Sequence, residues 1–378
     1  MNIYQIDIKD NKQFLKDLDV QGAGVNIMSK KMELLTFLIK DLKTPAINIL
    51  KQDALSIGAE LAVPSGVILC QKEYYNCLLI GTKKHIEILS KKELSQPFGL
   101  KKIAKELQKF LEIKQYPIEI MGVINANDDS FFAESRFKDS DAIEKIEQMI
   151  DDGATIIDIG AVSSRPNADI VTPKEEFDRI KNICNIIKDK ELYKKVSFSI
   201  DSYTPIVIEY ALNSGFNIVN DITGASDNRV VELVIKYKAK LCIMHMQGTP
   251  QTMQQNPKYS DIIIDISNFF EDRIEKCESI GLNRENIILD VGIGFGKTLE
   301  HNLTLIKNMK HFRKFGSPIL IGASRKSMID KIVPTPIKER LAGTLAIHLK
   351  AIDNGASIVR CHDVKEHTQA LKVWEALS

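Results

Sequence analysis

The fold is decided by a stretch that begins Thr155-Ile-Ile-Asp-Ile159, continues with Thr172-Pro-Lys-Glu175 and ends with Val196-Ser-Phe-Ser-Ile200. The two outer segments are short, apolar and rich in β-branched residues, which is typical of buried strands. Their nearly continuous hydrophobicity favours parallel strands that are covered on both faces. The middle segment offers a helix cap, a proline at the first helical position and acidic residues in the first turn. The stretch therefore predicts a strand–helix–strand unit.

The same alternation recurs along the chain from about residue 118. Amphipathic helical stretches separate eight apolar runs, which are Ile118–Ile124, Thr155–Ile159, Val196–Ile200, Asn217–Asn220, Lys240–His245, Asn286–Leu289, Pro318–Gly322 and Ser357–Arg360. The longest helical stretch, about Asp261 to Ile280, ends at Gly281, and Ala342–Asp353 ends at Asn354-Gly355. Eight strand–helix pairs fit a (β/α)8 or TIM barrel better than an open sheet. We therefore predict an α/β barrel domain over residues 113–378.

Residues 1–112 show a different pattern, which predicts a small α+β domain ahead of the barrel. We expect helices at Lys30–Leu42, Ile47–Ile57 and Leu100–Leu111, and strands at Gly66–Leu69 and Tyr74–Ile80. No residues of this region gather into a recognisable site. We expect a structural or oligomerisation role for it, with regulation as the alternative.

The overall composition excludes several classes of protein. The 378 residues include 51 basic and 50 acidic side chains, and this balance argues against binding to nucleic acid. No apolar run approaches the ~20 residues that span a bilayer, and the charged N-terminus lacks a signal peptide's apolar segment. The six cysteines form no C-x-x-C pair. We expect a soluble cytoplasmic protein with reduced cysteines, mostly in the core, and without a disulfide or zinc framework.

Polar residues follow every predicted barrel strand. They are Asn125, Asp158 with Ser164-Arg165-Pro166, Asp201, Asn220-Asp221, His245, Asp290, Ser324-Arg325-Lys326, and Arg360 with His362-Asp363. Any one of these residues is explained well enough as a loop cap or a paired core group. The carboxyl ends of barrel strands, however, share one mouth, where barrel enzymes do their chemistry. Eight polar ends together therefore predict an enzyme that binds a small polar ligand.

These residues divide into two chemical groups. Asp201, Asn220 and Asp290 offer acceptors and an amide, which suit a planar heterocycle with several N–H donors. Buried carboxylates need a partner, and Lys326 is a candidate for that role or for a bond to the ring. The second group is cationic and suits a phosphate or diphosphate; it consists of Arg165, Arg360 and His362, with Asn125 as an oxygen ligand for Mg²⁺.

Two features near the mouth are set aside as sites. Gly296-Lys297-Thr298 ends like a phosphate-binding P-loop, but Val291 stands where that motif requires a glycine. We interpret the glycine run instead as a tight loop whose backbone closely approaches a ligand. The histidines at positions 245, 301, 348 and 367 lack metal-ligand spacing and are interpreted as core or surface residues. His245 lies close to the mouth and is left open between the two roles.

The barrel region also resembles a known family, the dihydropteroate synthases among the pterin-binding enzymes. The resemblance runs in order over about residues 118–378. It rests on Met121–Asn125 with Asp129–Phe131, Gly153–Gly160 with Ser163–Pro166, Ser199–Asp201, Val219–Ile222, Met244–Pro250, Leu289–Lys297, Ser324–Ser327, Arg340–Thr344 and Val359–Glu366.

The resemblance implies a reaction of folate biosynthesis and a role for each matching residue. A dihydropterin-6-ylmethyl diphosphate joins 4-aminobenzoate, releasing pyrophosphate by a dissociative route in a Mg²⁺-dependent homodimer. The implied pterin-binding residues are Asp201, Asn220, Ile222, Met244, Asp290 and Lys326. Those for the diphosphate are Arg165, Arg360, His362 and Asn125, the last also binding Mg²⁺. Those for aminobenzoate are Phe131, Ser164, Pro166, Phe295 and Ser327, with Asp129 as a catalytic residue of the first loop.

The chain departs from the family pattern at a few positions. The first loop reads Asn125-Ala-Asn127-Asp128-Asp-Ser-Phe131, without the usual Thr-Pro pair, Ser164 replaces a threonine, and Val291 replaces a proline. We expect changed loop dynamics, Michaelis constants and sulfonamide sensitivity, and the same reaction class. Two alternatives are a corrinoid methyltransferase of the same superfamily, which would not need Arg165, Lys326, Arg360 and His362 for a diphosphate, and a degenerate, non-enzymatic barrel.

Overall fold

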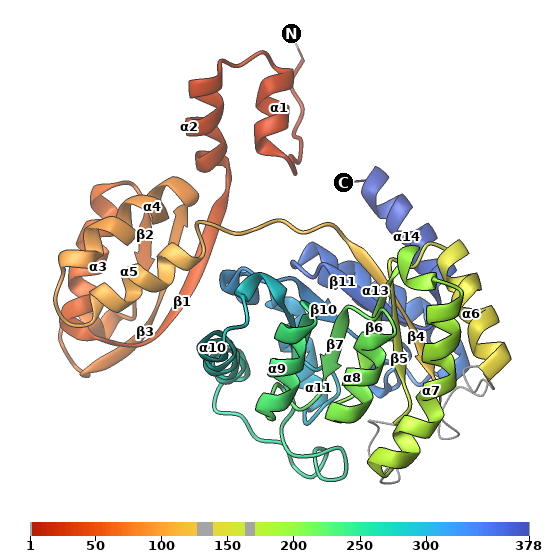
Figure 1. The fold of residues 1–378 in the computed structure, drawn as a ribbon. Coiled ribbons are helices and arrows are strands. Elements are labelled where there is room, and N and C mark those ends of the chain that lie inside the picture. Colours follow the sequence, from red (N-terminus) through yellow and green to blue (C-terminus); the bar gives the residue numbers. More distant parts are fainter. Residues whose placement is uncertain (1, 127–138, 163–170, 378) are drawn as a thin grey trace. The chain divides into compact units, whose positions relative to one another are not determined.

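The computed structural model describes residues 2–126, 139–162 and 171–377. The chain forms two compact units, Met1–Ile113 and Lys114–Ser378 (Figure 1). The boundary predicted from the sequence falls after residue 112.

The described residues of the second unit contain a closed barrel of eight parallel strands in the order β10-β11-β4-β5-β6-β7-β8-β9 (Figure 1). The strands are β4 Glu119–Asn125, β5 Ile156–Gly160, β6 Ser197–Asp201, β7 Ile218–Asp221, β8 Lys240–Met244, β9 Ile287–Asp290, β10 Ile319–Ile321 and β11 Ile358–Cys361. Each lies within a residue or two of a predicted run. The predicted TIM barrel is confirmed.

Helices follow the strands along the chain and cover the outside of the barrel (Figure 1). They are α6 Asp139–Asp151, α7 Pro173–Asp189, α8 Pro205–Asn213, α9 Asn228–Lys236, α10 Ile262–Ile280, α11 Leu299–Lys307, α12 Ser327–Ile332, α13 Leu341–Asp353 and α14 Val364–Ala376, with 3₁₀ turns at Leu192–Lys194, Arg284–Asn286, Met309–Phe315 and Ile337–Glu339. The cap that the sequence predicts at Thr172 is present, because its hydroxyl accepts from the Glu175 amide. Gly281 ends α10 in the left-handed conformation, as expected.

Two apolar layers hold the barrel together. One lies between strands and helices. The other fills the barrel interior with one side chain from each of seven strands, namely Met121, Ile156, Ile218, Cys242, Ile288, Leu320 and Ile358. Successive side chains of a strand alternate between its two faces. The residue two positions further along each strand therefore also faces inward, nearer the carboxyl-end mouth.

The first unit is a three-stranded antiparallel sheet in the order β1-β3-β2, with helices packed on it (Figure 1). Its elements are α1 Asn11–Asp17, α2 Gly22–Met32, β1 Leu34–Lys43, α3 Thr44–Ser56, β2 Glu60–Ala62, β3 Tyr74–Thr82, α4 Lys83–Lys92 and α5 Leu100–Lys109, with 3₁₀ turns at Ser65–Val67 and Glu93–Ser95. The predicted α+β class is confirmed, as are the elements expected at Ile47–Ile57, Tyr74–Ile80 and Leu100–Leu111.

Two predictions for this unit are wrong. Lys30–Leu42 is not one helix, because α2 ends at Met32 and β1 begins at Leu34. The apolar residues of β1 satisfy a helical spacing, but pairing with β3 from Leu34 to Lys43 fixes the segment as a strand. Gly66–Leu69 is not a strand either. Ser65–Val67 forms a single 3₁₀ turn, after which Ile68 and Leu69 are exposed.

Among the described residues, no helix is both long and apolar enough to cross a bilayer. All six cysteines are unpaired; five are buried, and Cys70 is exposed. Cys70 is thus the exception to the expected core positions.

Candidate active site

The inward faces of the barrel strands bring most of the predicted residues to one mouth. The alternation that starts from the interior cluster leads to Asn125 on β4, Asn220 on β7, Met244 on β8, Asp290 on β9 and Arg360 on β11. On β6, Phe198 and Ile200 belong to the outer layer, so Asp201 faces inward as well. Strand geometry alone therefore gathers side chains that lie up to 235 residues apart in the sequence (Asn125 to Arg360).

Arg360 is the charged centre of this group. Its Nε donates to Asp158 Oδ2 at 2.6 Å, and its Nη2 donates to Asp201 Oδ2 at 2.7 Å. Asn220 also donates to Asp158 Oδ2, at 3.2 Å. The sequence predicts a carboxylate pocket and a separate cationic pocket. Arg360 contacts the carboxylates directly, so it joins the two pockets. The partner of Asp201 is this arginine rather than Lys326.

Some acceptor atoms at the mouth remain unused. Within the described part of the chain, Asp158 Oδ1 and Asn220 Oδ1 are buried and have no hydrogen-bond partner. A buried acceptor without a donor costs about 1–3 kcal/mol, so such atoms in a native site call for an explanation. A ligand that brings N–H donors would satisfy them.

Burial and neighbouring charges shift the ionisation of the mouth residues. Burial raises the pKa of Asp201 to about 7, although Arg360 opposes the shift. Burial also raises the pKa of Asp290, against the Gly292 amide and Lys326. Burial lowers the pKa of Lys326 to about 8. Burial alone would lower the pKa of Arg360, but the negative charges of Asp158 and Asp201 outweigh the effect of burial and raise that pKa. Both the carboxylates and Lys326 are therefore sensitive to what binds beside them.

The glycine loop after β9 lies against Lys326. The Gly292 amide donates to Asp290 Oδ1 at 2.7 Å, which holds that carboxylate at the start of the loop. Lys326 Nζ donates to the Ile293 carbonyl and lies 4.5 Å from the centroid of the Phe295 ring. The loop thus places a cation and an aromatic ring side by side.

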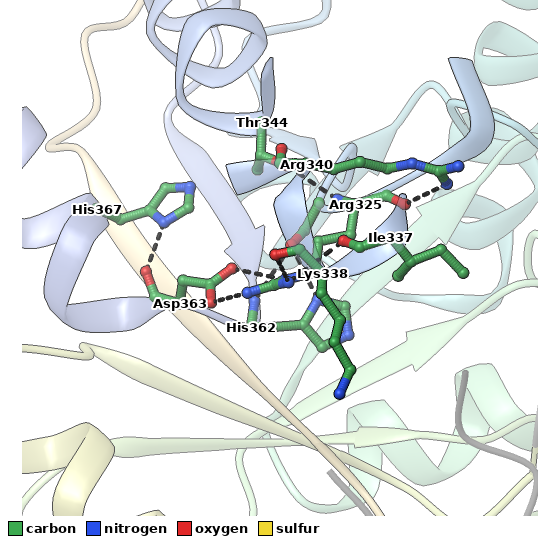
Figure 2. Close-up of polar contacts among 9 residues, drawn as sticks. Arg325, Ile337, Lys338, Arg340, Thr344, His362, Asp363 and His367 are labelled. Atoms are coloured by element: carbon green, nitrogen blue, oxygen red, sulfur yellow. Dashed lines mark hydrogen bonds and ion pairs between the residues drawn. The ribbon is translucent and has the colours of Figure 1, made fainter. Parts of the chain in front are cut away.

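A partly buried ion pair joins the segments that carry Lys326 and His362 (Figure 2). Arg325 donates to both carboxylate oxygens of Asp363, at 3.0 and 2.5 Å, and also to the carbonyls of Ile337 and Lys338. Ser324 Oγ lies 2.9 Å from His362 Nδ1. The loops after β10 and β11 are therefore fixed to each other by this pair and by the neighbouring Ser324–His362 contact.

Two histidines extend the network and are core residues, as interpreted from the sequence. His348 Nε2 accepts from the Ala323 amide at 3.1 Å, so His348 Nδ1 is the donor to His367 Nε2 at 2.9 Å. His367 Nδ1 then donates to the Asp363 carbonyl (Figure 2). Burial lowers the pKa of both imidazoles, which keeps them neutral.

The other predicted site residues have varied positions. Ile222 and Met244 are buried, Asn125 and Phe295 are partly buried, and Ser327 is exposed at the start of α12. Asn127, Asp128, Asp129, Phe131, Ser164, Arg165 and Pro166 lie outside the described residues. The described residues contain no group of three or more histidine, cysteine, aspartate or glutamate side chains that could hold a metal ion. An ion at Asn125 would need oxygen ligands from a substrate or water.

Three residues that organise this site have no role predicted from the sequence. Asp158 was noted only as a strand-end residue, but it stands two positions after the inward Ile156 and receives Arg360. This alternation of inward and outward side chains along the strand is the feature by which the sequence could have identified Asp158. Arg325 and Asp363 adjoin predicted ligands, and no sequence spacing indicates that they pair across 38 residues.

A barrel with acidic acceptors, a central arginine and a neighbouring lysine at its mouth defines an enzyme for a small polar substrate. Residues 121–362 match the family model described as pterin binding enzyme. The bifunctional dihydropteroate synthase/dihydropteroate reductase of Helicobacter pylori is 42% identical over 97% of this chain and 96% of its own length. The dihydropteroate synthase of Haemophilus influenzae is 40% identical over 68% and 93%.

A solved structure gives the same result. The Yersinia pestis dihydropteroate synthase, in complex with a sulfonamide drug, superposes with a TM-score of 0.65 at 34% identity, covering 69% of this chain and 94% of that one. The chain belongs to the dihydropteroate synthase family of pterin-binding enzymes. It is therefore an enzyme, and the non-enzymatic alternative is set aside.

Proposed function

We propose that the barrel condenses 7,8-dihydropterin-6-ylmethyl diphosphate with 4-aminobenzoate, giving 7,8-dihydropteroate and pyrophosphate. The observation that carries this proposal is the set of buried acidic and amide acceptors around Arg360, with Asp158 Oδ1 and Asn220 Oδ1 unpartnered among the described residues. The family membership supports the same reaction.

The pterin fits the acidic side of the mouth. Its ring presents several N–H donors in one plane, and Asp201, Asn220 and Asp290 offer acceptors from three strands. Met244, on the inward face of β8, and Ile222, directly after β7, are buried apolar side chains and would pack on the ring. The carboxylates also favour positive charge on the ring, so they assist a reaction in which the carbon–oxygen bond breaks before attack.

The leaving diphosphate fits the cationic side. When the bond breaks, the electron pair goes to the diphosphate oxygen, and Arg360 and His362 are the described residues proposed to neutralise it. Asn125, at the carboxyl end of β4, would hold Mg²⁺, which typically takes one or two protein ligands together with phosphate oxygens. The bound ion would add positive charge at those oxygens. The aniline nitrogen then forms the new carbon–nitrogen bond and loses a proton to the released pyrophosphate.

The aminobenzoate side is assigned to Phe295 and Ser327. Phe295 offers a ring face. Ser327 is the first residue of α12, directly after Lys326 in the chain, and offers a hydroxyl. Phe131, Ser164 and Pro166, which lie outside the described residues, complete this proposal. The first loop with Asp129 and the second loop with Arg165 would close over the mouth and exclude water from the reactive cation.

The test is to incubate the purified chain with Mg²⁺, the pterin diphosphate and labelled 4-aminobenzoate. We expect dihydropteroate and pyrophosphate in equal amounts, and inhibition by a sulfonamide that competes with aminobenzoate. The rival methyltransferase predicts methyl transfer from methyltetrahydrofolate to a corrinoid instead. Methyl transfer without dihydropteroate would overturn the proposal.

A second activity is favoured by one comparison. The relative from Helicobacter pylori, named as both a synthase and a dihydropteroate reductase, matches 97% of this chain, including the first unit. The Haemophilus influenzae synthase covers only 68%. We propose that the full chain also reduces dihydropteroate, with a two-electron donor supplying a hydride and water supplying the proton.

This second proposal has its own assay. The full chain is given dihydropteroate with reduced nicotinamide or reduced flavin, the two general hydride donors. We expect tetrahydropteroate from the full chain and none from residues 114–378. Failure of both donors would contradict the reductase and leave the synthase standing. Light scattering on the same two samples tests the proposed homodimer and the part that the first unit plays in it.

A further inference from the structure

The glycine loop between β9 and α11 contains a buried lysine that the proposed reaction does not use. Lys297 belongs to the tripeptide Gly296-Lys297-Thr298, which resembles the end of a P-loop but lacks the first glycine of that motif. Its exposed fraction is only 2%. Lysine is almost never fully buried unless it is paired. Its position therefore requires an explanation.

Three acceptors surround the Lys297 ammonium. Its Nζ lies 3.0 Å from His245 Nδ1, 3.2 Å from the His245 carbonyl and 2.9 Å from the Phe295 carbonyl. An ammonium has three N–H donors, one for each of these acceptors, although burial lowers the pKa of Lys297 to about 7. Burial lowers the pKa of His245 to about 3, which keeps its imidazole neutral and able to accept. Lys297 thus ties the end of β8 to the loop after β9.

The loop is held at four successive carbonyl groups by four different side chains. Lys326 donates to Ile293, Gln254 to Gly294 at 2.6 Å, Lys297 to Phe295, and Tyr259 to Gly296 at 2.7 Å. A Cβ at Gly292 would lie 2.0 Å from the His245 carbonyl, and one at Gly296 would lie 2.5 Å from the Gln247 carbonyl. The loop is therefore pressed against the segment after β8 and accepts only glycine at these two positions.

The two halves of the loop are not anchored equally. Gly294 is held on both sides, because its amide also donates to Asn302 Oδ1 at 2.8 Å. Without Lys297, this anchoring of Gly294 would still hold the neighbouring Ile293 carbonyl in place. Lys326, which donates to that carbonyl, would therefore also stay in place. The Phe295 amide donates to the Gly292 carbonyl at 3.1 Å, but the Phe295 carbonyl receives its hydrogen bond from Lys297. Loss of Lys297 should therefore displace Phe295 more than Lys326.

We propose that Lys297 is a positioning residue that fixes Phe295 for 4-aminobenzoate. The inference rests on the proposed synthase function and adds a residue that determines the affinity of its second substrate. A Lys297 variant loses three hydrogen bonds to one buried nitrogen together, which is enough to change binding about tenfold or more.

The experiment compares Lys297→Met with Lys276→Met in the full chain. Lys276 is a matched control on α10, because its Nζ also bridges two backbone carbonyls, those of Ala225 and Ser226, at 2.9 and 3.0 Å. For Lys297→Met we expect the KM for aminobenzoate to rise about tenfold, with the Kd for the pterin diphosphate within about twofold of the wild type. We expect Lys276→Met to leave both values unchanged.

An added amine provides a second measurement should Lys297→Met fail to fold. Lys297→Ala leaves a cavity into which propylammonium fits, and we expect it to restore aminobenzoate affinity, whereas the neutral propanol does not. Unchanged aminobenzoate affinity, or equal losses for both substrates, would overturn the inference while wild-type turnover upholds the proposed function. A wild type that makes no dihydropteroate would overturn both.

Discussion

The two units of this chain differ in how far their sequences reveal the position of a functional site. In the barrel, the polar residues stand at strand ends, and parallel strands bring those ends to one mouth. In the described part of the first unit, an antiparallel sheet and helices pack an apolar core, and a buried carboxylate there, Glu93, lies on a 3₁₀ turn beside Asp53 rather than at a strand end. The difference shows that a repeated strand–helix pattern locates a site even when its residues are far apart, whereas a single small sheet does not.

The largest expected effect tests the centre of the barrel mouth. Arg360→Ala removes the partner of two buried carboxylates and the proposed counter-charge for the diphosphate. We expect kcat/KM to fall by about 10²–10³ or more, as for other groups that stabilise transition-state charge. Steady-state kinetics with the pterin diphosphate measure it. Intact turnover combined with lost pterin binding would show that the division of roles is wrong.

A core substitution in the first unit tests whether the two regions are separable. Leu79→Ala empties a fully buried position on β3 and should destabilise that unit by about 2–5 kcal/mol in urea unfolding. Leu38→Ala, at an exposed position of β1, is the control and should cost little. We expect the dihydropteroate-forming rate of both variants to equal that of the wild type. A parallel loss of that rate in Leu79→Ala would mean that the barrel depends on the first unit.

The ionisation of the mouth predicts a pH dependence. Asp201, with a pKa of about 7, must lose its proton to favour a cationic ring, so kcat/KM should rise as the pH increases through about 7. Lys326, with a pKa of about 8, loses its charge above that value, so the rate should fall again. We expect a bell-shaped profile. Asp201→Asn should remove the acidic limb at a cost of about tenfold or more in the maximal rate, and an unchanged limb would exclude Asp201 as its origin.

The smallest expected effect concerns the pair in Figure 2. Asp363→Asn keeps the shape but weakens the two-point contact with Arg325 that joins the loops carrying Lys326 and His362. We expect a loss of about three- to tenfold in kcat/KM. Glu278→Gln, which weakens the equivalent two-point but exposed contact with Arg284, should have no effect. If the two variants show the same kcat/KM, Asp363 has no positioning role.

The sequence was sufficient for the barrel because buried parallel strands are continuous apolar runs that end at polar residues. It was insufficient where contacts join distant positions. Arg360 and Asp158 meet across 202 residues, and the acceptors of Lys297 include backbone carbonyls, which no residue type reveals. In the first unit the apolar spacing of Leu34–Lys43 suits a helix as well as a strand, and only its pairing with β3 decides.

The most direct test of the central claim measures product formation by the full chain and by residues 114–378 side by side. Each sample receives Mg²⁺, the pterin diphosphate and labelled 4-aminobenzoate, after circular dichroism has shown that it is folded. We expect both to form dihydropteroate and pyrophosphate in equal amounts and at similar rates, because every described residue that is assigned to the mouth lies on the barrel. Absence of dihydropteroate from the folded full chain would contradict the account.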